Sequence, residues 1–154
     1  MNNVGKRLKH IGERSFAYLC CMTLTNFTQQ LTIPTSALDV YTVLMDERRH
    51  SSFTSDFAHI QDQEGTAFSL YDGQFEGKNE VLERGKKIIW SFKVNDPNWP
   101  LHHYSEAALI LLQQSENSCT IELFHTAIPA GFEQRIEHFW NELIWEPLTY
   151  YLER

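Results

Sequence analysis

The sequence contains little of what several classes of protein require. Only three of its 154 residues are cysteine, seven are glycine and five are proline. The cysteines, Cys20, Cys21 and Cys119, form no CxxC pair and no zinc-binding spacing with histidine, and their odd number argues against a disulfide framework. No apolar run approaches the ~20 residues that a membrane-spanning helix needs. These absences predict a soluble, cytoplasmic protein that does not enter a membrane.

Basic charge is also scarce, and it is unevenly distributed. The formal net charge of the chain is −7, and residues 1–22 carry +3, which leaves −10 for residues 23–154. A domain this acidic repels phosphate backbones, so we expect no binding to nucleic acid. The basic residues precede a short apolar run but no small-x-small cleavage site. We therefore expect residues 1–22 to be a poorly ordered N-terminal extension rather than a signal peptide.

Catalytic motifs are missing as well. There is no HExxH, no GxSxG and no glycine-rich phosphate loop. His102 and His103 are adjacent, so on a strand they point to opposite faces and cannot chelate one metal ion together. His125 is the one residue that could act in proton transfer, although a lone histidine on an apolar face is more often a hydrogen-bonded core residue. We predict no catalytic residue, no metal site, no cofactor and no enzymatic activity.

The sequence is rich in aromatic residues, with ten Phe, six Tyr and four Trp, which can either fill a core or enclose a cavity. Loose alternation of β-forming residues predicts a strand over 25–33, which Pro34 ends. An amphipathic helical pattern follows over 35–45, with Thr35 or Ser36 as its cap. A second, shorter helical turn begins at residue 46.

The rest of the chain changes from a strand period to a helical one. Successive short strands separated by glycine and Asn/Asp turns predict an antiparallel meander over 59–128, clearest at 88–94, 104–112 and 119–128. Apolar residues then recur with a helical period over 132–152. Pro147 should kink this helix, because it removes the hydrogen bond to the Leu143 carbonyl. These elements predict one α+β domain over residues 23–154.

Several local patterns occur in the order found in one known family. They are Leu31-Thr32-Ile33-Pro34, Val40-Tyr41-x-x-Leu44-x-Asp46, Phe68-Ser69-Leu70-Tyr71-Asp72-Gly73, Ile88-Ile89-Trp90-Ser91-Phe92, Trp99-Pro100-x-x-His103-Tyr104-Ser105 and Trp145-Glu146-Pro147-Leu148. Together they resemble the activators of heat shock protein 90 ATPase, of the C-terminal-domain type. The resemblance implies a helix-grip, or START-like, fold. In that fold a curved antiparallel sheet wraps around a long C-terminal helix, and two short helices follow the first strand.

The resemblance also implies where a ligand would bind. In a helix-grip fold the space between the long helix and the sheet is either a ligand pocket or a packed core. The residues that we expect to line it are Trp90, Phe92, Tyr104, His125, Phe139, Trp140 and Leu143. Such pockets are mostly apolar with a few polar groups, which Tyr104 and His125 would supply. A shift of one residue in strand register would turn a side chain to the opposite face, so the sequence leaves pocket and packed core open.

Three functions remain as hypotheses. We favour a stand-alone module that binds a small apolar ligand or acts as a stress-linked accessory protein, because residues 1–22 do not resemble the N-terminal domain of two-domain co-chaperones. The alternative is a co-chaperone whose acidic surface binds heat shock protein 90 and stimulates its ATPase. The weakest is an enzyme that uses the cavity, with His125 as its protonatable residue.

Overall fold

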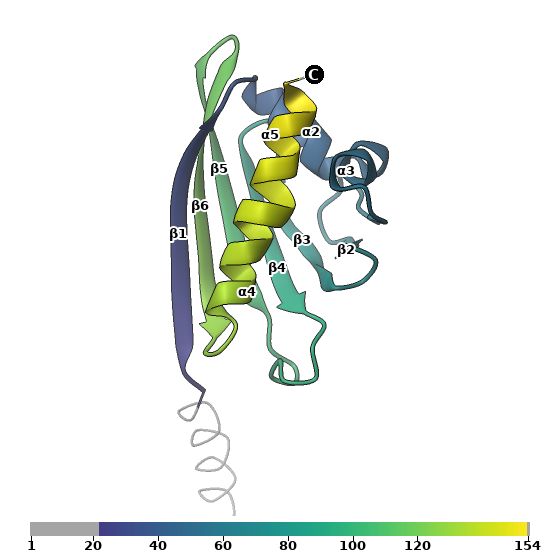
Figure 1. The fold of residues 1–154 in the computed structure, drawn as a ribbon, viewed down its shortest axis with the longest axis vertical. Coiled ribbons are helices and arrows are strands. Elements are labelled where there is room, and N and C mark those ends of the chain that lie inside the picture. The colour runs from purple at the N-terminus through teal and green to yellow at the C-terminus, as the bar shows by residue number, and fades with distance from the viewer. Residues whose placement is uncertain (1–21, 154) are drawn as a thin grey trace, which may run out of the picture.

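The computed structural model describes residues 22–153 of the chain, which form one sheet and a set of helices on one of its faces (Figure 1). The strands are β1 (Leu24–Ile33), β2 (Ala67–Leu70), β3 (Phe75–Glu83), β4 (Lys87–Val94), β5 (Ser105–Ser115) and β6 (Ser118–Pro129). The helices are α2 (Ala37–Met45), α3 (Glu47–Thr54), α4 (Glu133–His138), η1 (Phe139–Trp145) and α5 (Glu146–Leu152). The last three follow one another directly and make up the C-terminal helix.

The six strands form one antiparallel sheet in the order β1-β6-β5-β4-β3-β2. Strands β2 to β6 are a meander, and the first strand joins the sheet beside the last. The sheet curves around the C-terminal helix (Figure 1). The predicted helix-grip fold is therefore confirmed, including the two short helices after the first strand.

Local sequence explains where the two short helices begin. The Ser36 side chain accepts a hydrogen bond from the Asp39 amide at 3.1 Å, and the Asp46 side chain accepts one from the Arg49 amide at 2.9 Å. Both are N-caps that satisfy amides without a partner inside the helix. Within residues 22–153, no helix is long and apolar enough to cross a lipid bilayer. The predicted N-terminal extension, apart from Met22, lies outside the described residues.

Strand β4 shows how the sheet builds the core. Its residues alternate between the two faces, and Ile88, Trp90, Phe92 and Val94 are buried on the helix side. On the neighbouring strand β3, Gly77 has no room for a side chain, because a Cβ there would lie 1.8 Å from the Ser91 carbonyl oxygen. Only glycine therefore fits at this place on β3, because the backbone of β4 comes so close to it.

The C-terminal helix is widened just before Pro147. Residues 139–145 form a π-helix, and the Glu146 amide bonds to the Asn141 carbonyl five residues earlier. Pro147 itself lies at the start of α5, where the missing N–H is tolerated. The sequence correctly predicted an irregularity at this place, but the structure has a π segment ahead of the proline.

The π segment decides which side chains face the sheet. Residues five apart lie about 140° apart around an α-helix, whereas i→i+5 hydrogen bonding brings them to nearly the same side. Trp140 and Trp145 accordingly stack, with ring centroids 5.3 Å apart. The Tyr71 hydroxyl donates a hydrogen bond to the Leu143 carbonyl. Pro147 cannot donate to this carbonyl, because proline has no backbone N–H. The tyrosine thus completes the hydrogen bonding of the widened helix from outside it.

Replacing Tyr71 tests this external cap. We expect Tyr71→Phe to lower the free energy of unfolding by about 1–2 kcal/mol, because it leaves a half-buried carbonyl without its donor. Urea denaturation at neutral pH measures the change. Tyr104→Phe is the matched control, since the Tyr104 side chain is half exposed. Equal stability of the two variants would contradict the assignment.

Candidate functional site

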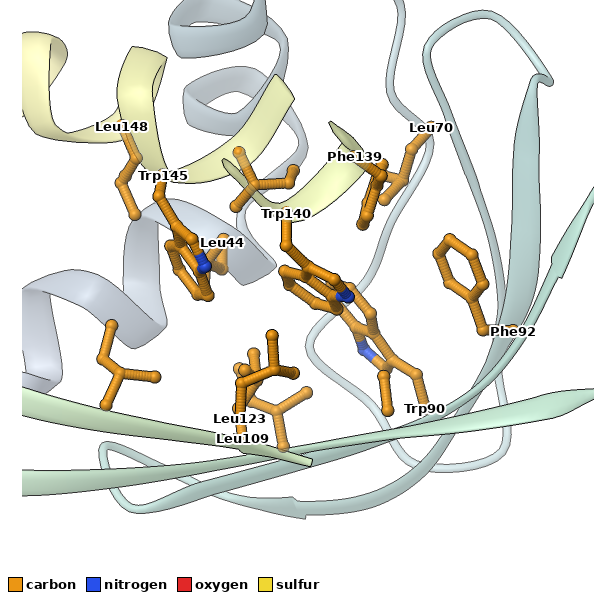
Figure 2. Close-up of a cluster of buried hydrophobic side chains, with 14 of the residues drawn as sticks. Leu44, Leu70, Trp90, Phe92, Leu109, Leu123, Phe139, Trp140, Trp145 and Leu148 are labelled. Carbon is orange, nitrogen blue, oxygen red and sulfur yellow. The ribbon is translucent and has the colours of Figure 1, made fainter. Parts of the chain in front are cut away.

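Of the seven residues predicted to line a pocket, five are buried in the core and Leu143 packs against that core while remaining partly exposed. Trp90 and Phe92 come from β4, His125 from β6, and Phe139, Trp140 and Leu143 from η1. Figure 2 shows the aromatic rings of this group gathered between helix and sheet. These residues belong to a larger buried core that also includes Leu109, Leu123 and Trp145. The assignment of a ligand pocket to this space stays a prediction.

Tyr104 is the exception. Strand β5 begins one residue later, at Ser105, and it is Ser105 that faces the helix and is buried. Tyr104 is 52% exposed and, together with Phe68 and Lys78, borders a hollow of about 710 Å³ that opens to the surface. The sequence prediction placed the start of this strand one residue too early, and that shift put the wrong side chain on the inner face.

The inward-facing rings pack against one another. Trp90 and Trp140 stack with centroids 6.2 Å apart, Phe92 and Phe139 are 5.0 Å apart, and Phe139 and Trp140 are 4.9 Å apart. These four residues and His125 have no accessible surface. A residue without accessible surface touches no space that a water-sized sphere could occupy. The rings therefore fill this part of the interior, and a ligand would have to displace them.

A chain of hydrogen bonds runs through these rings and joins the helix to three strands. The Trp140 indole N–H donates to His125 Nδ1 at 2.9 Å. Since Nδ1 accepts, the proton of a neutral imidazole is on Nε2, which donates to Ser105 Oγ at 2.8 Å. Ser105 in turn donates to the Phe92 carbonyl at 3.0 Å. Every polar atom of this buried chain is satisfied.

This arrangement determines the charge of His125. Burial lowers its pKa to about 3, because the positive form would lose its hydration. Both ring nitrogens are already engaged, so neither is free to take a proton from a substrate. The chemistry of His125 here is structural, as the commoner interpretation of a lone histidine on an apolar face predicted.

Glutamine holds the second stacked tryptophan in a similar way. The Trp145 indole N–H donates to Gln29 Oε1 at 3.0 Å, and Gln29 Nε2 donates to Asn141 Oδ1 at 2.5 Å. These two hydrogen bonds attach the π segment to β1. Sequence analysis missed Gln29, and the only indication was a polar residue on the inner face of the first strand.

Three buried side-chain polar atoms among residues 22–153 have no hydrogen-bond partner, His50 Nε2 and one atom each of Asn79 and Trp90. Asn79 on β3 and Trp90 on β4 lie opposite each other in the sheet. Within residues 22–153, neither the Asn79 Oδ1 acceptor nor the Trp90 Nε1 donor has a hydrogen-bond partner. A buried polar atom without a partner costs about 1–3 kcal/mol. Among these residues there is also no group of three or more His, Cys, Asp or Glu side chains placed to hold a metal ion.

The buried histidines predict a specific loss of stability in acid. An unfolded histidine has a pKa near 6.5, whereas the pKa of His125 is lowered to about 3 and that of His50 to about 4. As the pH falls below 6.5, the unfolded state binds protons that the folded state does not. We therefore expect each histidine to reduce the free energy of unfolding by about 2 kcal/mol between pH 7 and pH 4.5.

His125→Gln separates this effect from the titration of carboxylates. A glutamine can accept from Trp140 and donate to Ser105, but it does not titrate. Urea denaturation at the two pH values should show a pH dependence about 2 kcal/mol smaller than in the parent chain. The control, His59→Gln, makes the same substitution at a histidine whose side chain is 73% exposed, so the comparison isolates the effect of burial. An undiminished dependence in His125→Gln would mean that His125 is not buried as a neutral ring.

Comparison with known proteins shows which family the sequence resembles. A sequence model described as Activator of Hsp90 ATPase homolog 1-like protein matches residues 34–153. A curated relative from Dictyostelium discoideum, the activator of 90 kDa heat shock protein ATPase homolog, is 27% identical over 109 residues, which are 71% of this chain and 28% of the relative. The mouse activator homolog 2 is 22% identical over 119 residues, 77% of this chain and 35% of the relative. The chain thus spans about a third of the length of these relatives.

Solved structures share the same fold. The crystal structure of an HSP90 activator from Plasmodium falciparum matches with a TM-score of 0.77 and 20% identity, over 83% of this chain and 96% of that one. A protein from Mesorhizobium loti matches with a TM-score of 0.67 and 13% identity, over 84% and 98%. Identities this low support the fold alone. The sequence match, which extends from the end of the first strand to the end of the last helix, shows that the chain belongs to the Activator of Hsp90 ATPase homolog 1-like family.

Proposed function

We propose that this domain acts through its surface, as an accessory domain that binds heat shock protein 90 and stimulates its ATPase. The observation that carries the proposal is the filled interior of a chain that belongs to this family. Trp90, His125 and Trp140, which lie between helix and sheet, have no accessible surface. A partner would then bind most simply to the exposed faces of the domain. A catalytic role for His125 is disfavoured, because both of its ring nitrogens are hydrogen-bonded.

The exposed face of the C-terminal helix is the surface that we assign to the contact. It carries a row of exposed acidic side chains, Glu137, Glu142, Glu146 and Glu153. Residues 23–154 carry a net charge of −10, so the field around the domain attracts a basic partner surface. Charged rims of this kind speed association and make it sensitive to salt.

The direct experiment measures the ATPase rate of heat shock protein 90 from the same organism, with and without an excess of this protein. We expect a several-fold stimulation that weakens as salt is added. The double variant Glu137→Gln/Glu146→Gln should lower the stimulation at least about threefold at low salt, because it removes two charges from the helix face. The control Glu80→Gln/Glu116→Gln removes the same charge from exposed positions on β3 and in the turn between β5 and β6, and should stay close to the parent. Absence of stimulation and of any complex would overturn the proposal.

One observation favours a second function, in which a small apolar ligand displaces some of the packed side chains of Trp90, Phe92, His125, Phe139, Trp140 and Leu143. The unsatisfied Asn79 Oδ1 and Trp90 Nε1 could bond to a single ligand group that both donates and accepts, such as a hydroxyl. Native mass spectrometry of the purified chain tests this. Added mass that Trp90→Phe removes would support the ligand, and the bare mass of 18.0 kDa would leave only the surface function.

A further inference from the structure

The two edge strands of the sheet, β1 and β2, differ in length and in how their outer sides are hydrogen-bonded. Strand β2 has four residues, and its outer side is hydrogen-bonded to His59, with the His59 amide to the Ser69 carbonyl at 2.8 Å and the Ser69 amide to the His59 carbonyl at 2.9 Å. Strand β1 has ten residues and, in the part of the chain that the structure describes, pairs only with β6. Within residues 22–153, one edge is therefore short and covered, and the other is long and has no strand on its outer side.

Strand β1 lacks the features by which proteins protect an open edge. Its sequence, LTNFTQQLTI, contains no charged residue, no proline and no glycine. The irregularity in its pairing lies on the other strand. Thr25 and Phe27 are two residues apart whereas their partners Ile128 and His125 are three apart, and Ala127 has a φ of +58°. The bulge is therefore on β6, and β1 itself presents a regular edge.

Apolar side chains along this edge are only partly covered. Phe27 and Leu31 pack against the core but remain partly exposed, and Leu24 is 46% exposed. Phe27 and Leu31 lie on the same side of the strand as Gln29, whose side chain reaches the C-terminal helix. On the opposite side, Thr28 and Gln30 are exposed. A strand added to this edge would cover the apolar side chains and pair the free backbone groups.

We propose that β1 is a dimerisation edge, which pairs antiparallel with β1 of a second copy of this chain to form one continuous twelve-stranded sheet from two six-stranded ones. A two-fold axis makes such pairing self-complementary, because the same strand serves both partners. Threonine and glutamine then oppose threonine and glutamine on the outer side, where their side chains can hydrogen-bond.

A second copy offers the same uncharged strand, with the same alternation of partly exposed and exposed side chains. The surrounding domain is strongly acidic, so two copies repel each other wherever charged surfaces meet. Within residues 22–153, this uncharged strand offers a long edge where the copies can approach without placing like charges directly opposite each other. The second copy also brings its own half-exposed Phe27 and Leu31, which become buried against the first pair.

Sedimentation of the full chain over a range of concentrations tests the proposal. We expect the mass to rise from 18.0 kDa towards twice that value. Hydrogen exchange should show amides of β1 that become protected as the concentration rises, since pairing covers the outward N–H groups. A monomer up to about 1 mM would overturn the proposal. Protection of β1 at all concentrations without a change of mass would also overturn it, because a segment of the same chain would then cover the edge.

The variant Thr28→Lys/Gln30→Lys places charges on the proposed seam. Both side chains are exposed, so we expect the folded domain to persist while the dimer dissociation constant rises about tenfold or more. The control Gln63→Lys/Gln74→Lys adds the same charge at exposed positions near the opposite edge and should dimerise like the parent. A dimer that tolerates the β1 lysines would place the interface elsewhere, and a partner strand from a different protein that alone protects β1 would contradict self-pairing.

Discussion

The structure depends on one buried chain of hydrogen bonds between the C-terminal helix and the sheet. It begins at the Trp140 indole and passes through His125 and Ser105 to the Phe92 carbonyl. These four residues belong to η1, β6, β5 and β4, so the chain connects the helix with three neighbouring strands. Apolar packing alone would allow the helix to slide or rotate, whereas a buried donor that must meet its acceptor fixes one position. The neutral state of His125 is part of this constraint.

The fixed position of the helix determines how the remaining core side chains pack. The π segment turns Trp140 and Trp145 to the same side, and each indole finds a polar partner, His125 for one and Gln29 for the other. The rings then fill the space that a ligand would otherwise occupy. In the helix-grip fold the same space can be empty or full, so the fold does not decide the function. Here the filled interior supports the proposal that the domain acts through its exposed faces.

The exposed faces differ in chemistry. The C-terminal helix presents an acidic row to solvent, suited to a basic partner, while β1 presents an uncharged edge, suited to another strand. The two surfaces differ in kind, because one consists of side-chain charge and the other of backbone groups. A dimer through β1 would therefore display two acidic helices and double the number of contacts available to a two-fold symmetric partner.

The sequence predicted the fold because its two periodicities are strong and its local motifs resemble one family. It placed His125 on the inner face through its alternation with Ile121 and Leu123. It could not predict the partners of His125, since Trp140 and Ser105 lie 15 and 20 residues away and meet it only in the folded chain. Tyr104 and Ser105 were exchanged because nothing in the local sequence marks the residue at which β5 begins. Pro147 indicated where the last helix is irregular, but the π geometry arises from packing against the sheet.

The most direct test of the account is the protonation state of His125 by nitrogen-15 NMR of the imidazole at pH 5.5. The account predicts a neutral ring with the proton on Nε2 and an Nδ1 that accepts a hydrogen bond. At that pH an ordinary histidine is mostly charged, so the expected signal is distinctive. A charged imidazole, or a proton on Nδ1, would show that the chain from Trp140 to Phe92 does not exist and that the interior is held in another way.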